Sequence, residues 1–196
     1  FSPDNRFVLS ADVGLDQVLN YRLDADDAKL TTPRQPFLRT PAGAGPRHLT
    51  FHPNGRWVYV IHELSNAVSL LDYDKNDGLL IERQTISTLP ADFDGTSYCA
   101  DVKVTPDGRF VYGTNRGHDS IVVYRVGKQG KLKIVAIVPA DGAAGDGTIE
   151  ACRAPVKREM ALYIGGMGAR DKNYYNDYAK KLGFEAAAVE IQDHFL

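Results

Sequence analysis

Five charged or titratable residues stand at the ends of apolar runs, and their types suit attack of water on a carbonyl group. They are Arg47, His48, His62, Glu63 and Arg116. A carboxylate can accept a proton from water, and guanidinium groups hold an oxyanion, a phosphate or a carboxylate. Histidine side chains change charge near neutral pH. Arg47, Glu63 and Arg116 are therefore the candidate catalytic residues, and His48 and His62 are secondary candidates.

These residues belong to an internal repeat. The copies read "SPDNRFVLSADVGLDQVLNYRL", "HPNGRWVYVIHELSNAVSLLDY" and "TPDGRFVYGTNRGHDSIVVYRV", and their prolines, Pro3, Pro53 and Pro106, are separated by 50 and then 53 residues. Each copy has a Pro-Asp/Asn-Gly/Asn turn, an Arg-aromatic pair, a short strand, a polar turn and a second strand. Arg116 occupies the position of Glu63 in the next copy, so side chains from different copies could face one cavity.

The repeat predicts a mainly β fold. Further strands are expected in "KLTTPRQPFLRT", "LLIERQTIST" and "KLKIVAIV", which gives four strands in each unit of about 50 residues. We therefore expect a partial β-propeller of about three four-stranded blades over residues 1–139. An ordinary antiparallel sandwich is the alternative, although sandwiches do not usually repeat a turn motif at a fixed period.

The pattern changes after residue 139. Residues 140–147 are small and rich in glycine, which is typical of a linker. Apolar residues from Ile149 to Ile164 then recur at helical spacing, and a glycine-rich break follows at 165–168. Two more helices are expected, over 172–182 and over 184–194. Gly183 is expected to end the first of them. Residues 148–196 thus form a helical tail.

Composition limits the partners. The formal charge is −2, which favours neither nucleic acid nor an anionic membrane as partner. No apolar run reaches the roughly 20 residues that span a bilayer. The two cysteines do not resemble a disulfide framework, so a reducing, cytoplasmic compartment is expected. No motif indicates a metal or an organic cofactor.

Residues 1–138 resemble the lactonase family of seven-bladed β-propellers. The resemblance is carried by "FSPDNRFVLSADVGLDQVLNYRL", "GAGPRHLTFHPNGRWVYVIHELSN" and "SYCADVKVTPDGRFVYGTNRGHDSIVVYRV". It implies hydrolysis of a sugar lactone, commonly 6-phosphogluconolactone in the pentose phosphate pathway, without a cofactor. The family's site residues match Arg47, Glu63 and Arg116. A further family histidine lies in the strand before "FSPDNRF", outside this sequence.

Residues 148–196 resemble a different family, the luciferase-like oxidoreductases, around "ALYIGGMGARDKN". That family has a TIM-barrel fold and implies a flavin or deazaflavin coenzyme. Since the two folds are unrelated, the chain is expected to be a natural fusion, a fragment or an artificial join. Three blades do not close a ring, so we expect marginal stability, self-association or association with missing blades.

Alternatives remain for each site residue and for the function. A glutamate between two arginines is expected to form a stable ion pair, which opposes a role as a base. His48 and His62 could instead be polar groups at strand ends. Asp12 is expected to cap a turn and His52 to be structural. The leading function is a lactone hydrolase of carbohydrate metabolism, represented here by a fragment that lacks part of the site and is not necessarily active by itself. The alternatives are a non-catalytic propeller scaffold and a remnant of a flavin- or deazaflavin-dependent oxidoreductase.

Overall fold

The computed structural model describes residues 1–140, 174–181 and 183–195. The chain divides into two compact units, Phe1–Ala140 and Asp141–Leu196. The first unit is built of antiparallel strands, and the described part of the second consists of two helices. The mainly β fold class predicted from the repeat is confirmed.

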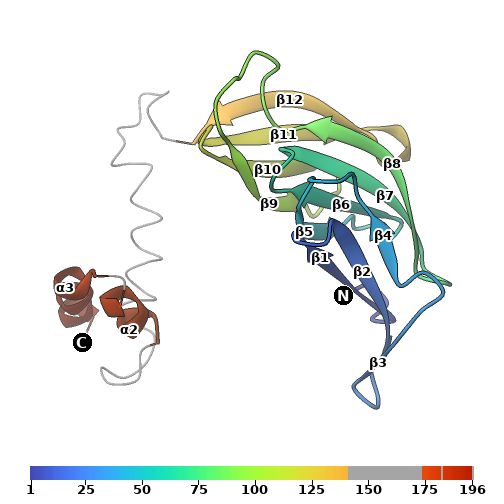
Figure 1. Ribbon diagram of the computed structural model, residues 1–196, viewed down its shortest axis with the longest axis horizontal. Coiled ribbons are helices and arrows are strands. Elements are labelled where there is room, and N and C mark those ends of the chain that lie inside the picture. The colour runs from blue at the N-terminus through green and yellow to red at the C-terminus, as the bar shows by residue number, and fades with distance from the viewer. Residues whose placement is uncertain (141–173, 182, 196) are drawn as a thin grey trace. The chain divides into compact units, whose positions relative to one another are not determined.

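Three four-stranded sheets make up the first unit. Their strands are β1 (Phe7–Asp12), β2 (Gln17–Asp24), β3 (Lys29–Thr31), β4 (Phe37–Arg39), β5 (Pro46–Phe51), β6 (Trp57–His62), β7 (Ala67–Asp74), β8 (Leu79–Ser87), β9 (Tyr98–Val104), β10 (Phe110–Arg116), β11 (Ser120–Val126) and β12 (Leu132–Pro139). Strands β5–β8 form one blade and β9–β12 the next, each in chain order. The predicted three blades are therefore present as sheets (Figure 1).

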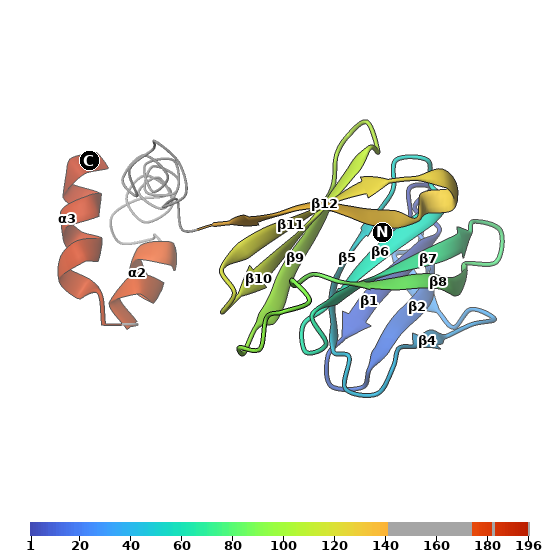
Figure 2. The same cartoon turned by 90° about the horizontal axis from the view of Figure 1, so that it is seen from above.

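The first sheet differs from the other two. Its strand β1 follows the Pro-containing turn, as β6 and β10 do, and both β3 and β4 pair with β2. Within the described residues, no strand of this sheet corresponds to the inner strands β5 and β9, so one edge of β1 is unpaired. Strand β5 contacts both β1 and β9, so these three strands lie side by side where the sheets meet (Figure 2).

The Pro-containing turns have the backbone that their sequences predict. Gly55 and Gly108 have φ values of +68° and +72°, which glycine adopts without steric cost. His52 lies in the second turn, where its Nδ1 accepts a bond from the Asn54 amide at 3.1 Å and its Nε2 donates to the Gly108 carbonyl at 2.9 Å. The expected structural role of His52 is therefore confirmed, and it links two blades.

The aromatic residue of the first and second repeats packs against a glycine of the following blade. A Cβ atom on Gly130 would lie 2.6 Å from Cδ2 of Trp57, and Gly78 is similarly close to the ring of Phe7. Gly130 lies in the 3-10 turn η1 (Lys128–Gly130) and has a φ of +76°. Phe110 occupies the same place in the third blade, where a pocket of about 310 Å³ lies beside it. The repeat motif thus encodes contacts between blades.

Two apolar clusters fill the spaces between the sheets. One surrounds Tyr59, Val68 and Tyr124 between the second and third blades, and the other surrounds Phe7, Val58 and Leu71 between the first and second. Each fully buried aliphatic or aromatic side chain contributes about 1.5–3 kcal/mol. Since each cluster draws on two neighbouring blades, the blades stabilise one another.

The second unit contains α2 (Tyr174–Lys181) and α3 (Glu185–Phe195), close to two of the expected helices. Asn176 links them, because its Nδ2 donates to the Ala188 carbonyl at 2.7 Å. Gly183 follows α2 with a φ of +90°, as expected of a residue that ends a helix. The helix predicted from Ile149 to Ile164 lies outside the described residues. Neither described helix is long and apolar enough to cross a membrane.

His62 is a buried histidine within the blade stack. Only 1% of its surface is exposed, and its Nε2 lies 2.8 Å from the Ser69 hydroxyl. Among the described residues, its Nδ1 has no hydrogen-bond partner. Burial lowers the pKa of His62 to about 4, although the charge of Asp16 opposes the shift. The ring is therefore neutral at physiological pH.

Substitution of Gly130 by alanine should destabilise the first unit more than the same change at Gly55. Both glycines have positive φ, which costs an alanine about 1–2 kcal/mol. Only at Gly130 would the new methyl group meet the Trp57 ring, which adds about 1–3 kcal/mol. Urea denaturation of both variants measures the difference. Equal losses would contradict the proposed contact.

His62 should make stability depend on pH. As the pH falls from about 6.5 to about 4, the unfolded chain binds a proton at His62 that the folded chain excludes. The free energy of unfolding should therefore fall over this window, by on the order of 3 kcal/mol. Denaturation at several pH values measures the slope. It should shrink in His62→Gln and persist in His48→Gln, and an unchanged slope in His62→Gln would contradict the assignment.

Candidate functional site

Arg47 lies on a β-bulge of strand β5. The pairing with β6 runs from Pro46 opposite His62 to His48 opposite Ile61, which leaves Arg47 without an opposing residue. A bulge changes the direction of a side chain relative to the regular pleat. Strand β9 has a pairing shift at the corresponding place, between Cys99 and Val102. The inner strands of both blades are therefore irregular where the candidate site lies.

Glu63 directly follows β6, and Arg116 is the last residue of β10, the equivalent strand of the next blade. The backbone of Glu63 is held from two directions. Its amide donates to the Gly45 carbonyl at 2.7 Å, and its carbonyl accepts from the Cys99 amide at 3.1 Å. The inner-strand segments of two blades thus fix the position of this carboxylate.

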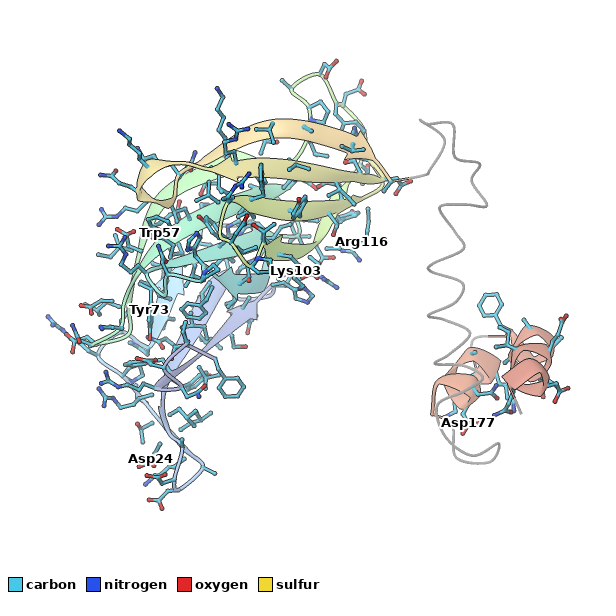
Figure 3. All side chains as sticks on the ribbon, turned by 180° about the vertical axis from the view of Figure 1, so that it is seen from behind. Asp24, Trp57, Tyr73, Lys103, Arg116 and Asp177 are labelled. Carbon is cyan, nitrogen blue, oxygen red and sulfur yellow. The ribbon has the colours of Figure 1, made fainter. Side chains whose placement is uncertain are left out.

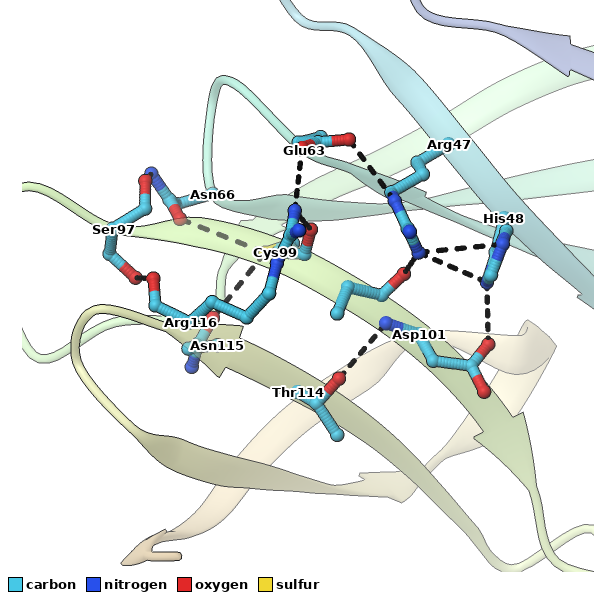
Figure 4. Close-up of polar contacts among 11 residues, drawn as sticks. Arg47, His48, Glu63, Asn66, Ser97, Cys99, Asp101, Thr114, Asn115 and Arg116 are labelled. Atoms are coloured by element: carbon cyan, nitrogen blue, oxygen red, sulfur yellow. Dashed lines mark hydrogen bonds and ion pairs between the residues drawn. The ribbon is translucent and has the colours of Figure 1, made fainter. Parts of the chain in front are cut away.

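The structure brings Arg47, Glu63 and Arg116 together (Figure 4). Nε of Arg47 lies 3.1 Å from Oε2 of Glu63, and Nη2 of Arg116 lies 2.5 Å from Oε1. The carboxylate is therefore clamped between two guanidinium groups from different blades. This is the ion pair that the sequence suggested as an alternative to a free base.

Both guanidinium groups are also anchored to strand β9. Nη1 of Arg47 donates to the Ala100 carbonyl at 2.5 Å, and Nη2 of Arg116 donates to the Cys99 carbonyl at 3.1 Å. Ala100 is the residue of β9 equivalent to Arg47, at the second bulge. The irregular strand therefore leaves carbonyl groups available to orient the arginines.

The cluster is partly open to solvent and carries a net positive charge. The side chains of Glu63, Arg47 and Arg116 are 23%, 30% and 51% exposed. Exposed ion pairs contribute at most about 1 kcal/mol to stability, so this arrangement is weak evidence for a purely structural role. Two guanidinium groups against one carboxylate leave one positive charge, which can attract an anionic ligand.

His48 borders the cluster and is engaged with Asp101. Its Nδ1 lies 2.9 Å from Oδ1 of Asp101, and Nη1 of Arg47 lies 3.4 Å from its Nε2. The same Nη1 lies 3.5 Å from Nδ1. The structure therefore places His48 beside the candidate site, in contact with both Arg47 and Asp101.

Asp101 is a neighbour of the site that the sequence reasoning missed. Partial burial would raise its pKa, but hydrogen bonds from Lys103 and His48 outweigh burial and hold the pKa below its usual value. Lys103 Nζ lies 2.6 Å from the second carboxylate oxygen. The repeat could have indicated it, because Asp101 stands 53 residues after His48 and therefore occupies the equivalent position of the next blade.

His62 does not belong to the cluster. Its hydrogen bond is with Ser69, inside the blade stack, and its neighbour Glu63 faces the arginines instead. Adjacent residues of an extended chain point to opposite sides, so both cannot face the same cavity. The secondary assignment of His62 to the site is not supported by the geometry, whereas a structural role explains its burial.

Two other groups near the site have structural roles. The Asp12 carboxylate accepts bonds from the Gly14 and Leu15 amides at 2.9 and 3.0 Å, which confirms the expected turn cap. Cys99 is a buried free cysteine, and burial raises the pKa of its thiol to about 11. The thiol is thus protonated near neutral pH and is not a nucleophile. The described residues contain no group of three metal-ligating side chains.

A groove of about 1280 Å³ lies at the opposite strand ends from the cluster. Trp57 and Tyr73 line it, and Figure 3 shows both far from Arg116. Its charged residues have both signs, for example Arg56 and Asp72. The groove therefore forms a separate surface and does not include Arg47, Glu63 or Arg116.

Comparison with known proteins agrees with the blade architecture. Residues 1–145 match the family model described as "Lactonase, 7-bladed beta-propeller". The 6-phosphogluconolactonase of Bacillus subtilis is 41% identical over 143 residues, which cover 72% of this chain and 40% of that protein. An uncharacterized protein of Staphylococcus saprophyticus is also 41% identical, over 142 residues that cover 72% of this chain and 39% of that protein.

Solved structures give the same result. The periplasmic gluconolactonase PpgL of Pseudomonas aeruginosa aligns with a TM-score of 0.68 and 34% identity, over 72% of this chain and 40% of that structure. A protein from Lactobacillus plantarum aligns with a TM-score of 0.68 and 32% identity over the same shares. The chain thus spans about 40% of the length of these relatives. From the family model, the sequence relatives and the three blades, we conclude that the chain belongs to the lactonase family of seven-bladed β-propellers.

Proposed function

We propose that the chain carries part of the active site of a lactone hydrolase of carbohydrate metabolism, similar to 6-phosphogluconolactonase. The observation that carries the proposal is the clamp of Glu63 between Arg47 and Arg116. Membership of the lactonase family and 41% identity to the Bacillus subtilis enzyme support the reaction class. A phosphorylated sugar lactone in the pentose phosphate pathway is the proposed substrate.

The ion pair requires an explanation of how Glu63 becomes a base. In the resting site each carboxylate oxygen of Glu63 contacts a guanidinium group, Oε2 that of Arg47 and Oε1 that of Arg116. We infer that the phosphate of the substrate competes for one guanidinium group, because guanidinium binds phosphate through two hydrogen bonds. One carboxylate oxygen of Glu63 is then released from its guanidinium partner and can accept a hydrogen bond from water.

The remaining steps follow from these positions. A water oxygen attacks the lactone carbonyl carbon while Glu63 takes a proton from the water. The other arginine stabilises the oxyanion of the tetrahedral intermediate. The bond between the carbonyl carbon and the ring oxygen then breaks, and Glu63 returns the proton to the departing alkoxide. The product is a sugar acid, and neither a metal nor an organic cofactor takes part.

Substitution of the clamp residues should separate proton transfer from anion binding. Glu63→Gln should lower kcat/KM for 6-phosphogluconolactone by about 100-fold or more, because the amide cannot act as a base. Arg47→Gln and Arg116→Gln should raise KM more for the phosphorylated lactone than for gluconolactone. Hydrolysis is measured against the spontaneous rate in buffer.

Arg83→Gln is the matched control, since Arg83 forms an exposed pair with Asp72 away from the clamp. It should leave hydrolysis unchanged. A Glu63→Gln variant as active as the unmodified chain would contradict the role of Glu63. A folded chain with no turnover above buffer would refute the proposal that this part of the site hydrolyses lactones by itself.

A non-catalytic binding scaffold is the second candidate. The observation that favours it is the groove at the opposite strand ends, which Trp57 and Tyr73 line together with charged side chains of both signs. Such a surface can bind a ligand or partner without any chemistry at the clamp. Absence of lactone turnover together with ligand binding that responds to Trp57→Ala would support the scaffold.

The resemblance of residues 148–196 to luciferase-like oxidoreductases remains a prediction. The family model ends at residue 145, and the whole motif, residues 161–173, lies outside the described residues. We propose that, if residues 148–196 are the remnant of such an oxidoreductase, they bind flavin or deazaflavin. Fluorescence titration with FMN and with a deazaflavin measures this, and a flat titration with both would remove the proposal.

The compartment and the assembly also remain proposals. We propose a cytoplasmic location on the basis of cysteine use, whereas the Pseudomonas aeruginosa relative is described as periplasmic. The free edge of β1 and the pocket beside Phe110 are surfaces at which further blades or a second copy could pack. Sugar lactones are the proposed small-molecule partners.

A further inference from the structure

We propose that Asp16 is a positioning residue for Glu63, acting from the neighbouring blade through the Gly43–Gly45 loop. The inference rests on the proposed function only in its effect on turnover. The positioning of Glu63 depends on hydrogen bonds, and their strength can be measured by hydrogen exchange without any reaction.

The first link joins Asp16 to the loop. Oδ2 of Asp16 accepts a hydrogen bond from the Gly43 amide at 2.7 Å, and Oδ1 accepts one from the Gly45 amide at 2.8 Å. These bonds, from Gly45 first and Gly43 second, lower the pKa of Asp16 below its usual value. The carboxylate therefore stays charged near neutral pH and holds both amides by charge-assisted bonds.

The second link joins the loop to Glu63. The Gly45 carbonyl accepts the Glu63 amide at 2.7 Å, and the Ala44 carbonyl accepts the Leu64 and Ser65 amides, both at 3.2 Å. The loop thus bonds to three successive amides of the turn that begins with Glu63. A shift of the loop would move the backbone from which the Glu63 carboxylate projects.

The loop sequence suits this arrangement. Gly43 and Gly45 have φ values of +76° and +63°, a region that disfavours other residues. At Gly45 a Cβ atom would lie 2.7 Å from Cγ of Leu64, so only glycine allows the close approach. The two amides can therefore converge on a single carboxylate while the loop lies against the Glu63 turn.

Asp16 is itself held in place by its backbone. It lies in the turn between β1 and β2 with a φ of +53°, and its carbonyl accepts the Thr40 amide at 2.9 Å. Glu63 is thus connected to the first blade through a rigid turn, a carboxylate and a loop. The position of Glu63 therefore depends in part on the first blade, which contributes no residue to the contact of Glu63 with the two arginines.

The next blade repeats the arrangement. Asn66 occupies the position of Asp16, has a φ of +50° and accepts the Thr88 amide at 2.9 Å through its carbonyl. Its Nδ2 donates to the Ser97 carbonyl at 2.8 Å, and the Ser97 hydroxyl donates to the Arg116 carbonyl at 3.1 Å. A turn residue of one blade thus reaches a site residue of the next blade in both places.

Asp16→Asn tests the proposal, with Asp12→Asn as the matched control. Asp12 lies in the same hairpin, and both of its bonds use one oxygen that asparagine retains. In Asp16→Asn, the new amide nitrogen cannot accept a hydrogen bond, so one of the two bonds to the loop is lost. Hydrogen exchange of the Glu63 amide should become about 10-fold faster or more, while exchange at buried Val60 stays unchanged.

Turnover supplies the second measurement. Asp16→Asn should lower kcat about 10-fold with little change in KM, since small displacements of a proton acceptor are costly. Asp12→Asn should change neither kcat nor the exchange rates. If the unmodified chain shows no turnover, the proposed function fails, but the exchange rates still decide the positioning role. Equal acceleration at Glu63 and Val60, or no acceleration at Glu63, would overturn the proposal.

Discussion

The candidate site depends on one interaction, the contact of the Glu63 carboxylate with guanidinium groups from two blades. Each carboxylate oxygen of Glu63 is held by one guanidinium group, so the resting site keeps both oxygens engaged. The same arrangement leaves one positive charge for an anionic substrate. In the proposed mechanism, anion binding and release of the Glu63 carboxylate are coupled, because a phosphorylated substrate would compete with Glu63 for the arginines.

The blades supply this interaction through irregular features of otherwise regular sheets. The bulge at Arg47 aims a guanidinium group at Glu63, and the matching irregularity in β9 offers the Ala100 carbonyl as its anchor. Contacts such as that of Trp57 on Gly130 keep neighbouring blades at a fixed separation. Packing between blades, rather than the stability of any single sheet, thus sets the geometry of the site.

Much of this arrangement could be predicted from the sequence. The period of the Pro-containing turns indicated the number of sheets, and the spacing of Glu63 and Arg116 placed them at equivalent strand ends. The alternation of a strand does not reveal which face is buried, so His62 and Glu63 could not be told apart. Asp16 and Asp101 were missed because their contacts cross between blades and depend on loop conformation.

An NMR titration with 6-phosphogluconate, the product of the proposed reaction, tests most directly whether a phosphate competes with Glu63 for the arginines. The Nε–Hε signal of Arg47 and the carboxyl carbon of Glu63 report on the two sides of the ion pair. If the phosphate competes with Glu63, both signals should shift together with one saturation curve, and Arg83 should not respond. Shifts at the groove residue Trp57, with none at Arg47 and Glu63, would contradict the account.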